Sequence, residues 1–229
     1  MGVWRALAMV VDRDFLADKI QRGAMAPTYG LVPPGLAGYG APERPDWAAL
    51  GPADRMARAK ALLAEAGYGP DRPLVAEIRF STSETQRATA IALADMWRPL
   101  GLEATLVNSD AKTLFALMRD GAFDIARAGW IGDYSDPQNF LFLCQSDNRG
   151  LNYARYADAG FDGLMRASAQ AGDVERMRDL HAAEALLIRD APLLTLMNPQ
   201  SKNMVQARVR GWEPNVMDRH PTRFISLAQ

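Results

Sequence analysis

The sequence predicts an α/β fold with a central, mostly parallel sheet flanked by helices. The prediction depends on an alternation of strand and helix patterns across residues 74–129. Short apolar runs typical of strands are separated there by longer segments with helical spacing. Strands are predicted at 74–80, 104–107 and 123–129, and helices at 84–100 and 110–119. Strands linked by helices in this way form right-handed crossovers, and they therefore lie parallel in one sheet.

Two helices and a long coil are predicted before this unit. Residues 4–22 have apolar side chains near helical spacing and end at Gly23, and residues 52–66 form an amphipathic helix pattern that ends at Gly67. Residues 24–50 are rich in Pro and Gly, but their leucine and aromatic side chains predict an ordered segment. Because no capping residue precedes the first helix, we expect the chain to be part of a longer protein.

The two helices inside the α/β unit carry local signals of their own. The helix at 110–119 should be capped by Asp110, whose side chain can accept a hydrogen bond from the first turn. The helix at 84–100 should bury one apolar face. That face contains Ala88, Ile91, Ala92, Met96 and Leu100.

A second helical region is predicted after the sheet. Its helices are expected around Phe140 and at 158–169 and 173–190, and Asp173 is the predicted cap of the last one. Residues 192–197 have the pattern of a buried strand. The rest of the chain is predicted to be irregular, with short extended pieces at 205–209 and 223–227.

Composition excludes several classes of protein. The chain has 229 residues, of which 48% are hydrophobic and 23% charged, with a net charge of −1. This is ordinary globular composition, and it gives no electrostatic footprint for nucleic acid. No apolar run is long enough for a transmembrane helix, and the opening residues lack the pattern of a signal peptide. The single cysteine, Cys144, cannot form an internal disulfide.

No motif for metal, nucleotide or cofactor chemistry is found in the sequence. His181 and His220 are far apart and lack ligand spacing, and no histidine is positioned by a motif to activate Cys144. We therefore predict no cofactor and no catalytic activity. One acidic group leaves an alternative open, because Asp133 and Asp136, with Asp124, could act as general acid and base at the end of the third strand.

The position of Asp133 favours ligand binding over catalysis. It follows the carboxyl end of a predicted parallel strand, where open α/β sheets bind their ligands. Gly129 and Gly132 would let another backbone approach, and Trp130 and Tyr134 offer flat apolar surface. A carboxylate at this place suits a cationic ligand group, although an aspartate that caps the following helix would leave the same pattern.

Four separated segments resemble the oligopeptide- and dipeptide-binding proteins of bacterial ABC importers, which form family 5 of the extracellular solute-binding proteins. They are RALAMVVDRD (5–14), ARAKALLAEAGY (57–68), FDIARAGWIGDYSDPQNFL (123–141) and the ending DRHPTRFISL. The resemblance implies a periplasmic binding protein with two lobes joined by a hinge. Residues 1–198 would form the second, C-terminal lobe without its first part, and residues 199–229 would return to the first lobe.

The resemblance also implies roles for single residues. Asp133 matches the aspartate that holds the α-ammonium of a peptide, and Arg127 matches an arginine that can meet the carboxylate of a short peptide. Residues 128–132, which include Gly129, Ile131 and Gly132, match the strand edge that pairs with the peptide backbone. Trp130 matches a pocket tryptophan, and Tyr134 belongs to the same acidic turn.

Other positions depart from the family pattern. Ala111 stands in place of a pocket tryptophan, and Met118 in place of a pocket arginine, with Arg119 beside it. Gln86 falls where a histidine can receive the carboxylate of longer peptides, and Gln21 or Arg22 where a lysine can do so. These departures leave the preferred peptide length and side chains open.

From this resemblance we expect the substrate-binding component of an ABC importer, which captures oligopeptides in the periplasm and passes them to a membrane permease. We expect no nucleic-acid partner, and a monomer in the full-length form. A dipeptide, a murein peptide, a nickel chelate or an opine-like compound are alternative ligands within the family. A carboxylate-based hydrolase and an autonomous interaction module are alternatives from other classes.

Overall fold

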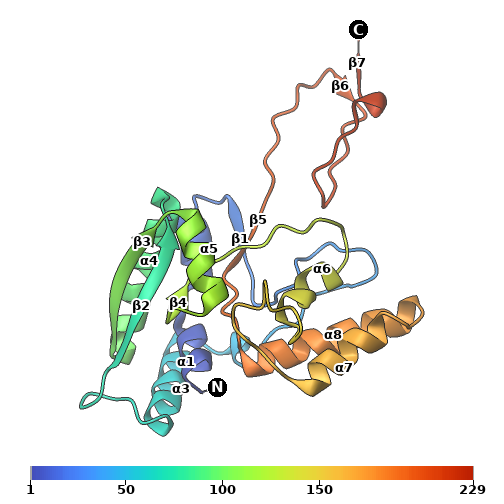
Figure 1. The fold of residues 1–229 in the computed structure, drawn as a ribbon. Helices are drawn as coiled ribbons and strands as arrows, with labels where there is room; N and C mark the ends of the chain where they lie inside the picture. The colour runs from blue at the N-terminus through green and yellow to red at the C-terminus, as the bar shows by residue number, and fades with distance from the viewer. Residues whose placement is uncertain (1, 229) are drawn as a thin grey trace.

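A three-stranded parallel sheet organises the first half of the chain in the computed structural model, which describes residues 2–228 (Figure 1). The strands β2 (Leu74–Ser81), β3 (Leu102–Ser109) and β4 (Ile125–Ala126) lie in the order β3-β2-β4. The helices α4 (Glu84–Trp97) and α5 (Ala111–Asp120) connect them. Because the chain moves outward to β3 and then back past β2, right-handed crossovers place α4 and α5 on opposite faces of the sheet. The predicted parallel α/β unit is confirmed.

The last strand is much shorter than predicted. β2 and β3 pair over eight residues, from Leu74 opposite Leu102 to Ser81 opposite Ser109. β4 pairs with β2 only through Ile125 and Ala126, and one further hydrogen bond joins the Arg127 amide to the Arg79 carbonyl at 2.8 Å. The predicted strand at 123–129 is therefore wrong in its extent. The chain leaves the sheet because the residues that follow are held by α6 (Gln138–Leu141), as described below.

Helix α4 buries only part of the predicted face, since Ala92 and Leu100 lie in the core and Ile91 does not. Its buried residues are Thr89, Ala90, Ala92, Leu93 and Trp97. The Trp97 indole donates a hydrogen bond to the Leu7 carbonyl at 3.0 Å, and this bond sets the rotation of the helix. Of the predicted face, Ile91 is 39% exposed. Together with Phe15 and Ile20, it lines an open groove on the far side of α4.

The N-terminal region is broken into three pieces rather than one helix. α1 (Gly2–Val10) packs against α3 (Pro52–Glu65), and both contribute to the core that the sheet and α4 complete. After α1, Asp12 caps a new turn by accepting a hydrogen bond from the Phe15 amide, and a wider helical turn covers Leu16–Ile20. The single helix predicted at 4–22 is wrong, because the chain leaves the helical conformation at Val11 and Asp12, and Asp12 starts the new turn with an extended backbone.

A second core lies beside the first and is built by helices. It joins α6, α7 (Ala159–Ser168) and α8 (Asp173–Asp190) to the coil that precedes α3. The coil is ordered as predicted, since Leu36, Tyr39 and Trp47 are buried. The predicted cap of α8 is wrong. Gly172 occupies the cap position, and Asp173 is the first helical residue without a capping hydrogen bond.

The remaining strands are short and antiparallel. β1 (Met25–Pro27) pairs with β5 (Met197–Pro199), so the strand predicted at 192–197 is shifted towards the C-terminus. β6 (Val209–Arg210) pairs with β7 (Ser226–Leu227) in a hairpin that stands away from the two cores (Figure 1). Across residues 2–228, no helix is long and apolar enough to cross a membrane.

Candidate ligand-binding site

Residues 128–132, called the strip below, form an extended connection between β4 and α6. After the hydrogen bond of the Arg127 amide, the next backbone–backbone bond along the chain runs from the Asp136 amide to the Tyr134 carbonyl. Within the described residues, no backbone group of the strip is hydrogen-bonded. Ala128 and Gly129 are exposed, and Ile131 is 82% exposed. The strip therefore offers unpaired donors and acceptors to another extended chain.

Two side chains of α6 fix the course of the strip. The buried Asn139 accepts hydrogen bonds through Oδ1 from the Trp130 indole at 2.9 Å and from the Asp133 amide at 3.3 Å. The Trp130 ring also packs edge-on against Phe142. A Cβ on Gly132 would lie 2.8 Å from the Phe140 ring, so this glycine is required by packing inside the chain. Nothing lies within 4 Å of a Cβ on Gly129, so of the two glycines in the strip this one leaves open space.

Asp133 ends the strip with a free carboxylate. Its side chain is exposed, and it accepts no hydrogen bond from any residue between 2 and 228. Tyr134 beside it is 50% exposed, and its hydroxyl donates to the Gln138 side chain. A negative charge without an internal partner is available to a cation from outside.

The other carboxylates of the acidic cluster already have structural partners. Asp136 accepts hydrogen bonds from the Gln138 amide at 2.8 Å and from Arg176 at 2.7 Å, so its carboxylate is bonded in the turn before α6. Asp124 lies before β4 and accepts from the Glu77 amide at 2.9 Å. The Asp136 carboxylate is therefore occupied in the turn before α6, whereas the Asp133 carboxylate has no hydrogen-bond partner among residues 2–228.

Polar groups of two further predicted site residues lack partners. The Arg127 Nε and the Gln86 Oε1 are buried without a hydrogen bond. Burial lowers the pKa of the Arg127 guanidinium, because desolvation disfavours its charged form. Unsatisfied buried groups are rare in folded proteins and mark places where a bound molecule can complete the hydrogen bonding.

The remaining predicted site residues differ in their burial. Ala111 is exposed at the first turn of α5, whereas Met118 is 2% exposed and packs between that helix and the sheet. Gln21 is buried and donates to the Thr89 hydroxyl at 2.9 Å, and Arg22 has a left-handed backbone with φ of 52°. Sequence reasoning missed Asn139, because it follows Gln138 and precedes the apolar run 140–144, and nothing in this pattern marks it as a buried hydrogen-bonding residue.

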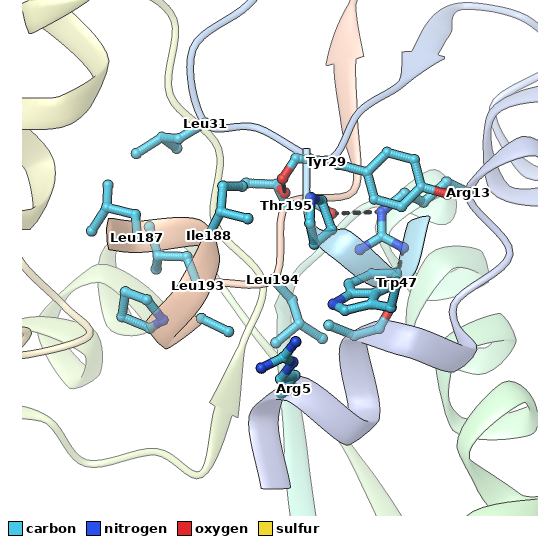
Figure 2. Close-up of a pocket in the computed structure, with 14 residues that line it drawn as sticks. Arg5, Arg13, Tyr29, Leu31, Trp47, Leu187, Ile188, Leu193, Leu194 and Thr195 are labelled. Atoms are coloured by element: carbon cyan, nitrogen blue, oxygen red, sulfur yellow. Dashed lines mark hydrogen bonds between the residues drawn. The ribbon is translucent and has the colours of Figure 1, made fainter. Parts of the chain in front are cut away.

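A small, partly open cavity lies elsewhere, between the two cores (Figure 2). Its volume of about 30 Å³ suits one or two waters and not a peptide. Arg13 lies at one side, between the rings of Tyr29 and Trp47, and donates to the carbonyls of Thr195 and Ala8. Burial lowers the pKa of Arg13 to about 10. These contacts make Arg13 an anchor for the surrounding coil.

Among residues 2–228, neither a metal-binding cluster nor a reactive cysteine is found. No cluster of three or more His, Cys, Asp or Glu side chains that could hold a metal ion is found within this range. Cys144 is buried in the second core, and burial raises the pKa of its thiol to about 12. A thiol with so high a pKa is a poor nucleophile, because only the thiolate reacts.

The chain matches the sequence profile of a known family over residues 2–152. That family is described as the bacterial extracellular solute-binding proteins, family 5 middle region. The periplasmic murein peptide-binding protein MppA of Escherichia coli is 32% identical over 212 residues, which are 92% of this chain and 39% of that protein. The periplasmic oligopeptide-binding protein OppA of Salmonella typhimurium is 34% identical over 209 residues, or 90% and 38%.

Solved structures show the same similarity in three dimensions. The unliganded open form of MppA superimposes with a TM-score of 0.91 at 31% identity, over 99% of this chain and 44% of that one. Haemophilus influenzae OppA in complex with the peptide RPPGFSPFR gives a TM-score of 0.85 at 29% identity, over 100% and 45%. The chain thus spans about two fifths of the length of the curated relatives that it matches.

Proposed function

The chain belongs to family 5 of the bacterial extracellular solute-binding proteins, and we propose that it is part of the substrate-binding component of an ABC importer for oligopeptides. Relatives with a third of the residues identical are named as periplasmic oligopeptide- and murein peptide-binding proteins. By this proposal the protein works in the periplasm, captures a peptide and delivers it to a membrane permease without catalysis.

The unpaired strip and the free carboxylate of Asp133 are the observation that carries the proposal. A peptide laid along residues 128–132 would form main-chain hydrogen bonds, which give affinity without regard to its side chains. Its α-ammonium would then meet Asp133, which accepts no hydrogen bond within the described chain. A zwitterionic ligand that loses water on binding needs such a partner, because an unpaired buried charge is costly.

The carboxylate end of the peptide has a candidate partner as well. Arg127 precedes the strip, and its Nε is buried without a hydrogen bond. An arginine can hold a carboxylate through two parallel hydrogen bonds. We assign Arg127 to the carboxylate of a short peptide and Gln86 to the end of a longer one. Trp130 is assigned to the wall of a side-chain pocket.

The C-terminal part of the chain is proposed to belong to the opposite lobe. Residues 1–198 contain both cores and the strip, whereas residues 200–206 are exposed throughout and lead to the separate hairpin of β6 and β7. A segment with so little burial of its own needs a partner surface to be ordered. In a two-lobed protein, closure would enclose the peptide between this segment and the strip.

Calorimetric titration of the intact protein tests the proposal. A tripeptide and a tetrapeptide should bind, whereas the N-acetylated tripeptide should bind at least a hundredfold more weakly. The variant Asp133→Ala should lose about 3–5 kcal/mol of binding free energy, as when one partner of a buried pair is removed. Asp147→Ala is the matched control, because Asp147 is an exposed aspartate away from the strip.

Three results would contradict parts of the proposal. Absence of binding to any peptide would leave the family membership intact and would direct the search to other solutes. Tight binding that is indifferent to both acetylation and Asp133→Ala would remove Asp133 from the site. Chromatography of the peptides after incubation should return them unchanged, and hydrolysis would favour an enzyme instead.

A further inference from the structure

The C-terminal segment returns to the strip at one point. Figure 1 shows the loop after β6 descending from the hairpin towards the connection between β4 and α6. At its tip, the Arg219 Nη2 lies 3.5 Å from the Asp133 carbonyl oxygen. The Val216 side chain of the same loop approaches Gly35, at 4.0 Å from the position of a Cβ. The loop therefore reaches the end of the strip where the candidate ammonium site lies.

The tip of this loop is braced by its own side chains. Asn215 holds the backbone of Arg219 through two hydrogen bonds, at 3.0 Å to its amide and 2.9 Å to its carbonyl. Asp218 accepts from the Asn203 side chain at 2.7 Å. The rings of Trp212 and His220 stack with centroids 3.6 Å apart. This bracing fixes the backbone that presents Arg219, so its place beside Asp133 is set by the loop.

Arg219 forms no ion pair within residues 2–228. No carboxylate oxygen of residues 2–228 lies within 4.0 Å of its guanidinium, and the only acceptor that the guanidinium reaches there is the backbone carbonyl of Asp133. A guanidinium carries five N–H donors, so most of them remain open. The side chain is also exposed, which leaves those donors accessible to a ligand.

We propose that Arg219 is a specificity-determining residue that favours peptides whose N-terminal residue carries a side-chain carboxylate. The inference rests on the proposed function, in which Asp133 holds the α-ammonium. The first side chain of such a peptide leaves the carbon next to the ammonium, and it therefore lies close to Asp133 and to the guanidinium that touches it. A glutamate or aspartate there can pair with Arg219, whereas a lysine is repelled.

The test compares three peptides that differ only in the first residue. The intact protein is titrated calorimetrically with Glu-Ala-Ala, Gln-Ala-Ala and Lys-Ala-Ala at low and high salt. Glu-Ala-Ala should bind roughly threefold to fivefold more tightly than Gln-Ala-Ala, which is the size of an exposed ion pair, and salt should reduce the ratio. Lys-Ala-Ala should bind more weakly than Gln-Ala-Ala.

Substitution then assigns the preference to a residue. Arg219→Gln should bring the ratio between Glu-Ala-Ala and Gln-Ala-Ala close to one, with the affinity for Gln-Ala-Ala changed by less than about twofold. Arg219→Lys should restore part of the ratio. Arg223→Gln is the matched control, since Arg223 is an exposed arginine of the same segment that lies over Phe224, and it should keep the full ratio. Circular dichroism checks that each variant is folded.

The possible failures can be told apart. If none of the peptides binds the wild-type protein, the proposed function is wrong, and so is this inference, because it rests on that function. If the peptides bind but show no preference, or if the preference survives Arg219→Gln, only the role of Arg219 is overturned. Equal weakening of all three peptides by Arg219→Gln would also overturn it, because Arg219 would then only support the strip.

Discussion

Two carboxylates of this chain, Glu184 and Asp133, are placed in opposite ways. Glu184 on α8 is fully buried and accepts hydrogen bonds from the Val32 amide, the Tyr39 hydroxyl and the Glu43 amide, at 2.8–3.0 Å. Asp133 is exposed and accepts none within the described residues. The first carboxylate holds residues 30–43 on the second core, and the second has no structural task. The same chemical group thus serves stability where it is satisfied and is free for binding where it is not.

The largest expected effect on stability is that of Glu184→Ala. The change leaves the buried Val32 amide, the part-buried Glu43 amide and the buried Tyr39 hydroxyl without an acceptor and opens a cavity. We expect the free energy of unfolding to fall by about 3–5 kcal/mol, which is typical of breaking a buried polar network. Urea denaturation followed by circular dichroism measures it. Glu65→Ala, at an exposed glutamate, is the control and should stay within about 0.5 kcal/mol of the wild type. Equal effects of the two changes would show that the network adds nothing.

The two glycines of the strip allow a second comparison, between one position that is packed and one that is open. A Cβ at position 132 meets the Phe140 ring at 2.8 Å, whereas one at position 129 meets nothing within 4 Å. Gly132→Ala should therefore lower the free energy of unfolding by about 1–2 kcal/mol through overpacking, and Gly129→Ala should change it by less than about 0.5 kcal/mol. Urea denaturation of both variants tests this. Similar values would mean that α6 does not constrain the strip.

The pH dependence of stability tests the burial of Glu184. Burial raises the pKa of Glu184, since desolvation outweighs the three hydrogen bonds. A raised pKa in the folded state contributes stability that is present below the unfolded pKa and is lost as the pH rises through the folded value. The deficit of Glu184→Gln relative to the wild type should therefore shrink between pH 4 and pH 7. Denaturation curves of both proteins at the two pH values give the deficit, and one that grows with pH would contradict this.

Local patterns were sufficient for the α/β unit. The alternation of patterns located β2, α4, β3 and α5, and Asp110 caps α5 as predicted by accepting a hydrogen bond from the Thr113 amide. Each of these features depends on neighbours within a few residues. The errors arose where distant residues decide. The face of α4 is set by Trp97 and Leu7, and the end of β4 by Trp130 and Asn139, neither of which is encoded in hydrophobic periodicity.

Part of the candidate site could likewise be predicted from the sequence, and part of it could not. Asp133 could be placed after a strand from the sequence, and the resemblance to the peptide-binding family supplied its proposed role. Its distinction from Asp136 required the structure, because both residues lie in one turn and only the bonds from the Gln138 amide and Arg176 show that Asp136 is the occupied carboxylate. Arg219 could not be predicted, since it is separated from Asp133 by 86 residues of chain.

The smallest expected effect on stability is also the one that distinguishes the two carboxylates most clearly. Asp133→Asn removes a charge that has no partner among residues 2–228 and preserves the backbone amide that bonds Asn139. The free energy of unfolding should change by less than about 0.5 kcal/mol, in contrast to the loss at Glu184. Urea denaturation measures the difference. A loss above about 1 kcal/mol would mean that Asp133 stabilises the turn, and its proposed availability to a peptide ammonium would then be wrong.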